Sequence, residues 1–274
     1  MLELFHAAPS YYSMVARLAL AEAQIPYTSR LLDIHLAKQQ LGAAYRQLNP
    51  HMTVPTLRGP ALLLTDSADI LRYASEHTTA SWADAEPQLQ SPIQTAVDGH
   101  YAISIETLTF SKLLAGQPWL KPLITKVLSG LVQKLDDQAA DSSTDAEALQ
   151  AKAKQNRQRL ATLTAEPAAQ TLAAMRAQVI TYLHSLPTPE PNGWLFGRNI
   201  CRADVVVAVL CARLSMAGEL ELLQRPDLQH WWQQIQQRPA FAAADIWTRF
   251  RRRDFVGAVL QARHTPITAS SRGV

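Results

Sequence analysis

The first residues of the chain pass from a strand-like pattern to a helix-like one. Leu2 and Leu4 alternate with polar neighbours, as in a short, half-buried strand. Helical spacing follows, with Val15, Leu18 and Ala19 on one face. This order predicts a strand followed directly by an amphipathic helix.

A second pair of elements follows. Gln24-Ile25-Pro26 ends the helix, and Tyr27–Asp33 is short, tolerant of β structure and bounded by polar residues, which predicts a second strand. A short helix is expected over Ala43–Leu48, and Asn49-Pro50 breaks it. The two predicted strands flank the first helix, the one that carries Val15 and Leu18, so these three elements form a βαβ unit.

An antiparallel pair is expected next. Val54–Leu57 and Ala61–Leu64 are two apolar runs that turn at Gly59-Pro60, and a helix begins near Ser67. The complete order, βαβαββα, predicts an α/β domain of the thioredoxin-like type over residues 1–80.

Helical patterns dominate the remainder, which predicts an all-α domain over residues 91–274 after a linker at Pro87–Pro92. Residues 136–178 are rich in Ala, Gln, Lys and Arg. A capping box at Thr144–Glu147 and a break at Glu166-Pro167 indicate two long helices there, weakly packed at their outer ends.

Composition narrows the function classes. The chain has 274 residues, of which 47% are hydrophobic and 18% charged, so it carries enough apolar matter to build cores. A net charge of +3 does not favour a nucleic-acid binder, and the cluster at Arg249–Arg253 fits a solvated helix end. Neither GxGxxG nor GxxxxGK is present, and no His spacing suits a metal, so nucleotide and metal sites are not expected.

The two cysteines indicate a reducing compartment. If Cys201 and Cys211 share one helix, they lie about 15 Å apart, beyond the reach of a disulfide. No apolar run is long enough to span a membrane, and the N-terminus does not resemble a signal peptide. We expect a cytoplasmic protein. Membrane attachment through the apolar residues of 250–260 is a weaker alternative.

Three separated motifs now become informative. They are Pro9–Ala19, then the series Asn49-Pro50, Val54–Leu57 and Asp66-Ser67, and finally Gly197–Asp204. Together, in this order and spacing, they resemble the glutathione transferase superfamily. The stretch from Ala212 to Phe241 is similar to the branch that contains tetrachlorohydroquinone reductive dehalogenase and the ganglioside-induced differentiation-associated proteins, which also carry a long insertion between the fourth and fifth helices.

The resemblance implies a catalytic hydroxyl at the start of the first helix. Ser10 aligns with the reactive Ser or Cys of the family, Tyr12 aligns with the reactive cysteine of the dehalogenase branch, and Ser13 is a further rival. A thiol with a pKa near 8.5 becomes a useful nucleophile beside a hydroxyl donor and a helix N-terminus. Judged from the residues alone, Ser10 or Ser13 is equally an ordinary helix cap. The loop has no cysteine, which argues against dehalogenase chemistry.

The resemblance also implies a glutathione site. A cis turn at Val54-Pro55 would leave a backbone N–H and C=O free for the peptide, although X-Pro bonds are usually trans. Asp66 and Ser67 suit the ammonium and carboxylate of a γ-glutamyl group, or they simply cap a helix. Met52 and Thr53 stand where the family often has Lys or Gln, so reduced affinity for glutathione is expected. The remaining cationic candidates for the missing partner are Arg17, Lys38 and His51.

The resemblance therefore implies a glutathione-dependent transferase that conjugates or reduces a small apolar electrophile, with glutathione as co-substrate and no metal. The electrophile is expected against His100, Ile103 and Thr107. The alternative is a binding or scaffold protein that has the fold without the catalysis. A homodimer is expected, with no nucleic-acid partner and no membrane association.

Overall fold

The N-terminal domain is a four-stranded sheet with helices on both faces. A computed structural model describes residues 1–267 of the chain. The elements of this domain are β1 (Leu2–His6), α1 (Tyr11–Glu22), β2 (Tyr27–Leu31), α2 (Ala43–Leu48), β3 (Thr56–Gly59), β4 (Leu62–Leu64) and α3 (Ser67–His77). This is the predicted βαβαββα order, so the thioredoxin-like fold is confirmed.

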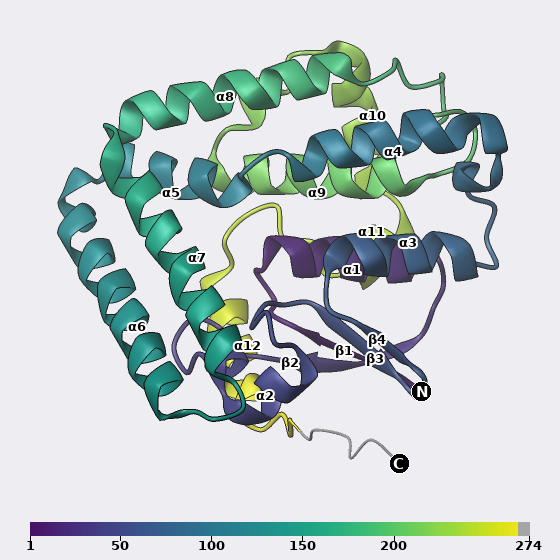
Figure 1. Ribbon diagram of the computed structural model, residues 1–274. Coiled ribbons are helices and arrows are strands. Elements are labelled where there is room, and N and C mark those ends of the chain that lie inside the picture. The colour runs from purple at the N-terminus through teal and green to yellow at the C-terminus, as the bar shows by residue number, and fades with distance from the viewer. Residues whose placement is uncertain (268–274) are drawn as a thin grey trace.

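The sheet has the order β2-β1-β3-β4. β1 runs parallel to β2, whereas β3 is antiparallel to both β1 and β4. Figure 1 shows α1 and α3 together on one face of the sheet and α2 on the other. Phe5, Tyr45 and Leu48 pack between the sheet and α2, while the opposite face joins the main core. Both faces of the sheet are therefore covered.

Helices joined by loops make up the C-terminal domain in the described part of the chain. Its α-helices are α4 (Pro87–Tyr101), α5 (Ile105–Gly116), α6 (Lys121–Asp141), α7 (Ala146–Ala165), α8 (Ala168–Ser185), α9 (Arg202–Ala217), α10 (Pro226–Gln236), α11 (Pro239–Ala243) and α12 (Arg252–Ala262). The predicted end of this domain at residue 274 lies outside the described residues. No helix within residues 1–267 combines the length and the apolar character needed to cross a bilayer.

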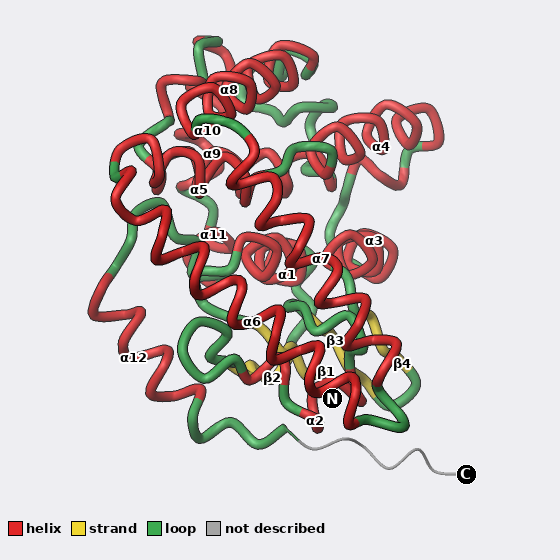
Figure 2. The backbone as a smooth tube through the Cα atoms, turned by 60° about the vertical axis from the view of Figure 1, so that its left-hand side comes forward, coloured by secondary structure: helices red, strands yellow, loops and turns green. Residues whose placement is uncertain are grey.

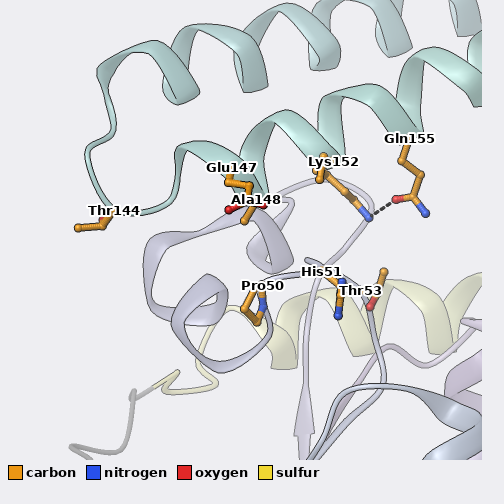
Figure 3. Close-up of a pocket in the computed structure, with 9 residues that line it drawn as sticks. Pro50, His51, Thr53, Thr144, Glu147, Ala148, Lys152 and Gln155 are labelled. Atoms are coloured by element: carbon orange, nitrogen blue, oxygen red, sulfur yellow. Dashed lines mark hydrogen bonds between the residues drawn. The ribbon is translucent and has the colours of Figure 1, made fainter.

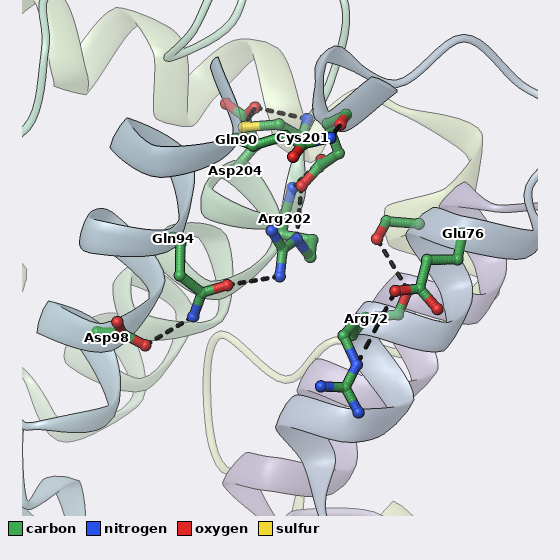
Figure 4. A network of polar contacts seen from close by, with 10 residues as sticks. Arg72, Glu76, Gln90, Gln94, Asp98, Cys201, Arg202 and Asp204 are labelled. Atoms are coloured by element: carbon green, nitrogen blue, oxygen red, sulfur yellow. Dashed lines mark hydrogen bonds and ion pairs between the residues drawn. The ribbon is translucent and has the colours of Figure 1, made fainter. Parts of the chain in front are cut away.

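The buried helix α9 centres the C-terminal domain and contacts α1, α3 and α4. Asp204 caps it: its carboxylate accepts hydrogen bonds from the backbone N–H of Cys201 (2.9 Å) and Leu195 (3.0 Å) and from the indole of Trp231 (2.9 Å). Figure 4 shows this cap beside Arg202, which bonds Gln94 of α4. Asp204 therefore caps the N-terminus of α9 and ties it to Trp231.

Four sequence-based predictions in this domain are wrong. Pro87–Pro92 is the first part of α4 and not a linker. Pro87 takes the first helical position, where it lacks only an N–H that would be unpaired anyway, and Pro92 lies inside the helix. The chain crosses between the domains over residues 78–86 instead. The capping box at Thr144–Glu147 does not form, because Asp145 is the N-cap and its carboxylate binds Arg46.

The third correction concerns the long insertion. Residues 136–178 contain the end of α6, all of α7 and the start of α8, rather than two helices. The break at Glu166-Pro167 is confirmed, since α7 ends at Ala165 and α8 begins at Ala168. Figures 1 and 2 show α6 and α7 side by side, descending from the helical domain past the sheet toward α2.

The far end of the α6–α7 hairpin packs firmly on the N-terminal domain. Met52 joins a small separate core with four residues of the hairpin: Leu135 and Ala139 of α6, and Leu149 and Ala153 of α7. An ion pair of 3.0 Å between Arg46 of α2 and Asp145 fixes the turn. The expectation of weak packing at this end is therefore wrong, because the sequence pattern did not reveal which surface the hairpin would meet.

Candidate functional site

The topology brings the N-terminal ends of α1 and α3 to one end of the sheet, where β1 and β4 end and β3 begins; this end is called the edge of the sheet below. In the register of the strands, Phe5 near the end of β1 lies opposite Thr56 at the start of β3. Leu64, the last residue of β4, lies opposite Leu57. The loops that leave β1 and β4 and the loop that enters β3 therefore meet, and they carry Ser10, Ser67 and Val54.

Ser10 is the N-cap of α1. Its Oγ accepts a hydrogen bond from the Ser13 backbone N–H at 3.4 Å, which leaves its O–H free to donate. Ser10 is partly exposed, whereas Ser13 is fully buried and accepts from the Ala7 N–H at 3.3 Å. The first turn of α1 has no acidic residue, so the positive end of the helix dipole is not neutralised there. Of the two serines, only Ser10 presents its hydroxyl to a ligand.

Tyr12 points toward the domain contact. Its ring stacks on Tyr101 of α4, with centroids 6.1 Å apart and planes 10° apart. Burial first, and then the neighbouring Asp66 carboxylate, raise the pKa of Tyr12. The phenol therefore stays protonated and is placed between α1, α3 and α4.

Asp66 and Ser67 begin α3 in different ways. Asp66 is exposed and caps the helix by accepting from the Ala68 N–H at 2.7 Å. Ser67 is 2% exposed, and its hydroxyl lies 3.0 Å from the Tyr101 phenol oxygen. One carboxylate faces solvent here, while the serine hydroxyl is already paired with the other domain.

The Val54-Pro55 peptide bond is cis, as expected. Within residues 1–267, neither the N–H nor the C=O of Val54 has a hydrogen-bond partner. The preceding loop is held from below, because the Tyr45 hydroxyl and the Asn49 amide donate to the Thr53 carbonyl at 2.7 and 3.0 Å. The backbone at Val54 is thus positioned and open to an extended peptide.

Met52 and Thr53 have different roles: the first packs in a core, and the second lines a groove. Met52 is 1% exposed and has a left-handed backbone (φ 54°), so it serves packing under the α6–α7 hairpin. Thr53 lines a groove of about 560 Å³ between this loop and α7. Figure 3 shows Thr53 and His51 facing Lys152 and Gln155 across the groove. The inserted hairpin therefore adds a wall beside the cis-proline loop.

Two residues predicted to meet the electrophile lie in the core. His100 and Ile103 are 2% and 3% exposed. His100 stacks on Tyr11 at 5.6 Å, and burial lowers its pKa to about 3. Thr107 is the member of the set that keeps some exposure, and its hydroxyl lies 2.7 Å from that of Ser104. In this structure His100 and Ile103 present no open surface to a substrate.

The three cationic candidates for a glutathione contact differ in burial and in position. Arg17 is 4% exposed and donates to the carbonyls of Ala244 (2.7 Å) and Asp245 (2.9 Å), so it joins α1 to the segment after α11 and is not a ligand residue. Lys38 lies in a left-handed turn beside α6. His51 is exposed and lines the groove.

The two cysteines belong to α9, with Cys201 at its N-cap and Cys211 within it. Cys201 and Cys211 are free and buried, and burial raises the pKa of both thiols, that of Cys211 to about 12. A protein thiol therefore takes no part in the site. Among residues 1–267, no three His, Cys, Asp or Glu side chains gather as metal ligands.

The comparisons with known proteins agree with the topology. Residues 4–82 match the family model of the glutathione S-transferase N-terminal domain. No curated protein sequence is similar enough to the chain to count as a match. The superfamily resemblance of this domain is supported, whereas the dehalogenase branch stays a prediction.

Solved structures resemble the whole fold. A β-etherase from Sphingobium sp. strain SYK-6 has a TM-score of 0.58 at 16% identity, over 89% of this chain and 98% of that chain. A glutathione transferase homologue from Sulfitobacter with bound glutathione has a TM-score of 0.54 at 20% identity, over 89% and 96%. A glutathione S-transferase bound to lactoylglutathione has a TM-score of 0.57 at 16% identity, over 89% and 98%. At these identities the likeness concerns the fold.

Sequence reasoning missed two residues beside this site. Tyr101 contacts both Ser67 and Tyr12, but nothing in the helical pattern distinguishes it from its neighbours on α4. Lys152 belongs to a stretch rich in Lys and Arg, where no spacing marks one cation. Both come from the helical domain, so only the docking of the two domains reveals them.

Proposed function

We propose that this chain is a glutathione-dependent transferase that conjugates or reduces a small apolar electrophile. The proposal rests on one observation. At the same end of the sheet lie the Ser10 hydroxyl at a helix N-terminus, whose O–H can donate, the cis-proline backbone of Val54, which has no partner within residues 1–267, and the start of a second helix. The family match of residues 4–82 and the glutathione bound by a structure of similar fold support it.

Each group has a chemical task in this proposal. The unpaired N–H and C=O of Val54 pair with the cysteinyl residue of glutathione, as in addition of a strand. The exposed Asp66 carboxylate meets the γ-glutamyl ammonium, and the first turn of α3 at Ser67 meets the carboxylate. The glutathione sulfur then lies near the start of α1.

Ser10 activates the thiol. Its O–H donates to the thiolate, and the positive end of α1 further stabilises the negative charge, so the pKa of the bound thiol falls. The thiolate attacks the electrophile, the new bond forms at sulfur, and the leaving group departs with its electron pair. The chain needs no cysteine of its own for conjugation.

Variants of Ser10 and Tyr12 test this assignment. Ser10→Ala should raise the pKa of bound glutathione in a thiolate absorbance titration and cut transfer to a generic aromatic electrophile by ~10-fold or more, the usual scale for losing one positioned donor. Tyr12→Phe is the control and should change both much less, because its ring packs on Tyr101. If Tyr12→Phe shifts the titration and Ser10→Ala does not, the roles are reversed.

A non-catalytic binding protein is the second candidate. The observation that favours it is the Ser67 hydroxyl, which is buried and already paired with Tyr101. In that case glutathione binds weakly, and neither Ser10→Ala nor Tyr12→Phe changes the absorbance titration.

We infer a homodimer and a cytoplasmic location for this enzyme. β4 is an edge strand whose Leu63 is 45% exposed, and edge strands are usually covered. Two free cysteines suit a reducing compartment. Light scattering at micromolar concentration should report twice the chain mass of 30.3 kDa, and a single chain mass would refute the dimer.

A further inference from the structure

The groove beside the cis-proline loop joins the two domains. Pro50, His51 and Thr53 line one side, and α7 of the inserted hairpin lines the other. Where α7 faces the loop, two of its residues are alanines, Ala148 and Ala151, whose small side chains leave room for a ligand. The groove is thus a space between a loop of one domain and a helix of the other.

One ammonium group in this groove, that of Lys152, has no counter-ion among residues 1–267. Lys152 is partly buried, and its Nζ donates to the Gln155 side-chain oxygen at 2.9 Å. No ion pair within residues 1–267 includes Lys152. Burial lowers its pKa to about 8. An ammonium that has lost water without gaining an anion favours the binding of one.

The two charged side chains of the groove, Lys152 and Glu147, lie toward opposite ends of it. Figure 3 shows the Lys152 side chain beside Gln155 and over His51 and Thr53, with Glu147 toward the opposite end. A carboxylate therefore finds its favourable position at the Thr53 end. That end adjoins the site proposed for glutathione, because Thr53 directly precedes Val54.

The order of residues in glutathione then assigns the occupant. With the γ-glutamyl group at Asp66 and Ser67 and the cysteinyl residue at Val54, the third residue extends past Thr53. We propose that Lys152 of the inserted hairpin binds the glycyl carboxylate of glutathione and so determines specificity for the complete tripeptide. This inference rests on the proposed function.

The packing of the hairpin explains how Lys152 is positioned. Leu149 and Ala153, which flank it on α7, are fully buried against Met52 and the end of α6. Met52, which replaces a polar residue often found at this point of the family, thus holds the helix that supplies a cation instead. The helical domain thereby completes a site that begins on the N-terminal domain.

Two ligands that differ only at this carboxylate test the proposal. S-methylglutathione and its glycyl ethyl ester share every other group and have no titrating thiol. Lys152→Gln should weaken binding of S-methylglutathione about ten- to a hundredfold, as expected for loss of a charged hydrogen bond, and leave ester binding unchanged. Lys154→Gln, an exposed lysine on the same helix, should change neither affinity.

The pH dependence of ligand binding by the wild type is a second test that needs no variant. As pH rises from about 7 to about 9.5, Lys152 loses its charge, so the preference for S-methylglutathione over the ester should disappear. His51 and Glu147 are the other titratable side chains lining the groove, and control variants His51→Gln and Glu147→Gln should keep this pH dependence.

The outcomes separate this inference from the proposed function. If the wild type binds S-methylglutathione but Lys152→Gln binds it equally well, or weakens both ligands alike, Lys152 does not meet the glycyl carboxylate while the transferase proposal stands. If the wild type binds neither ligand, both are overturned.

Discussion

The hydroxyl groups of Ser67 and Tyr101 lie 3.0 Å apart and join the start of α3 to the end of α4. Ser67 is 2% exposed, and the Tyr101 ring continues the contact by stacking on Tyr12. The helical domain therefore reaches the residue at which the proposed γ-glutamyl site begins. The proposed γ-glutamyl site and the contact between the two domains therefore share one hydrogen bond, that between Ser67 and Tyr101.

Removing either hydroxyl separates these two roles. Ser67→Ala should lower the free energy of unfolding by about 1 to 3 kcal/mol, because it leaves the buried phenol unpaired, and should weaken glutathione binding by a similar amount. Tyr101→Phe should cost about 1 kcal/mol of stability but leave binding unchanged. Urea denaturation and calorimetric titration measure the two effects. Unchanged affinity in Ser67→Ala would give the residue a packing role alone.

The charge of Asp66 should matter more than its capping bond. Asp66→Asn keeps a side-chain oxygen for the Ala68 N–H but loses the attraction to the γ-glutamyl ammonium. Affinity for glutathione should fall about three- to tenfold, as expected for a partly exposed charge pair. Asp69→Asn, in the same turn of α3 and paired with Arg72, should leave the affinity unchanged. Equal losses in both variants would point to a general field effect.

The α6–α7 hairpin should stabilise the fold through its buried end. Leu149→Ala removes a fully buried side chain from the small core around Met52, so the free energy of unfolding should fall by about 2 to 4 kcal/mol. Leu123→Ala, on α6 with Leu123 56% exposed, should change it by less than about 0.5 kcal/mol. Similar small effects in both would mean that the hairpin lies loosely on the N-terminal domain.

Acid should destabilise the protein through His100. Burial lowers the folded-state pKa of His100 to about 3, so below pH 6.5 the unfolded chain binds the proton that the folded chain excludes. The contribution of His100 to the free energy of unfolding should therefore be fully present above about pH 6.5. It should fall by about 2 kcal/mol between pH 6.5 and pH 5.

Thermal unfolding across that pH range measures the effect. His100→Gln keeps a polar partner for the Tyr11 hydroxyl and should remove the contribution of His100, leaving that of His6, whose pKa burial also lowers to about 3. His77→Gln, at an exposed position, should not change the dependence. An unaltered pH profile in His100→Gln would contradict a buried neutral imidazole.

The sequence predicted the local elements well because their signals are local. Alternation at Leu2 and Leu4, the turn at Gly59-Pro60 and the Asn49-Pro50 break each act over a few residues, and the observed β1, β3, β4 and α2 follow them. Pro87–Pro92 misled because a proline-rich stretch fits the start of a helix as well as it fits a linker.

The candidate site was harder to predict, since burial depends on how the domains dock. Ser13 and Arg17 look like site residues in the sequence, yet α1 turns both into the protein. Tyr101 and Lys152 look ordinary, yet α4 and α7 bring them to the edge of the sheet. No periodicity within one element carries that information.

Calorimetric titration of the wild-type protein with glutathione tests the central claim most directly. The open backbone of Val54, the exposed Asp66 and the cationic groove at Lys152 predict saturable, single-site binding with a Kd in the millimolar range or tighter. Binding that does not saturate even at tens of millimolar glutathione would contradict the account.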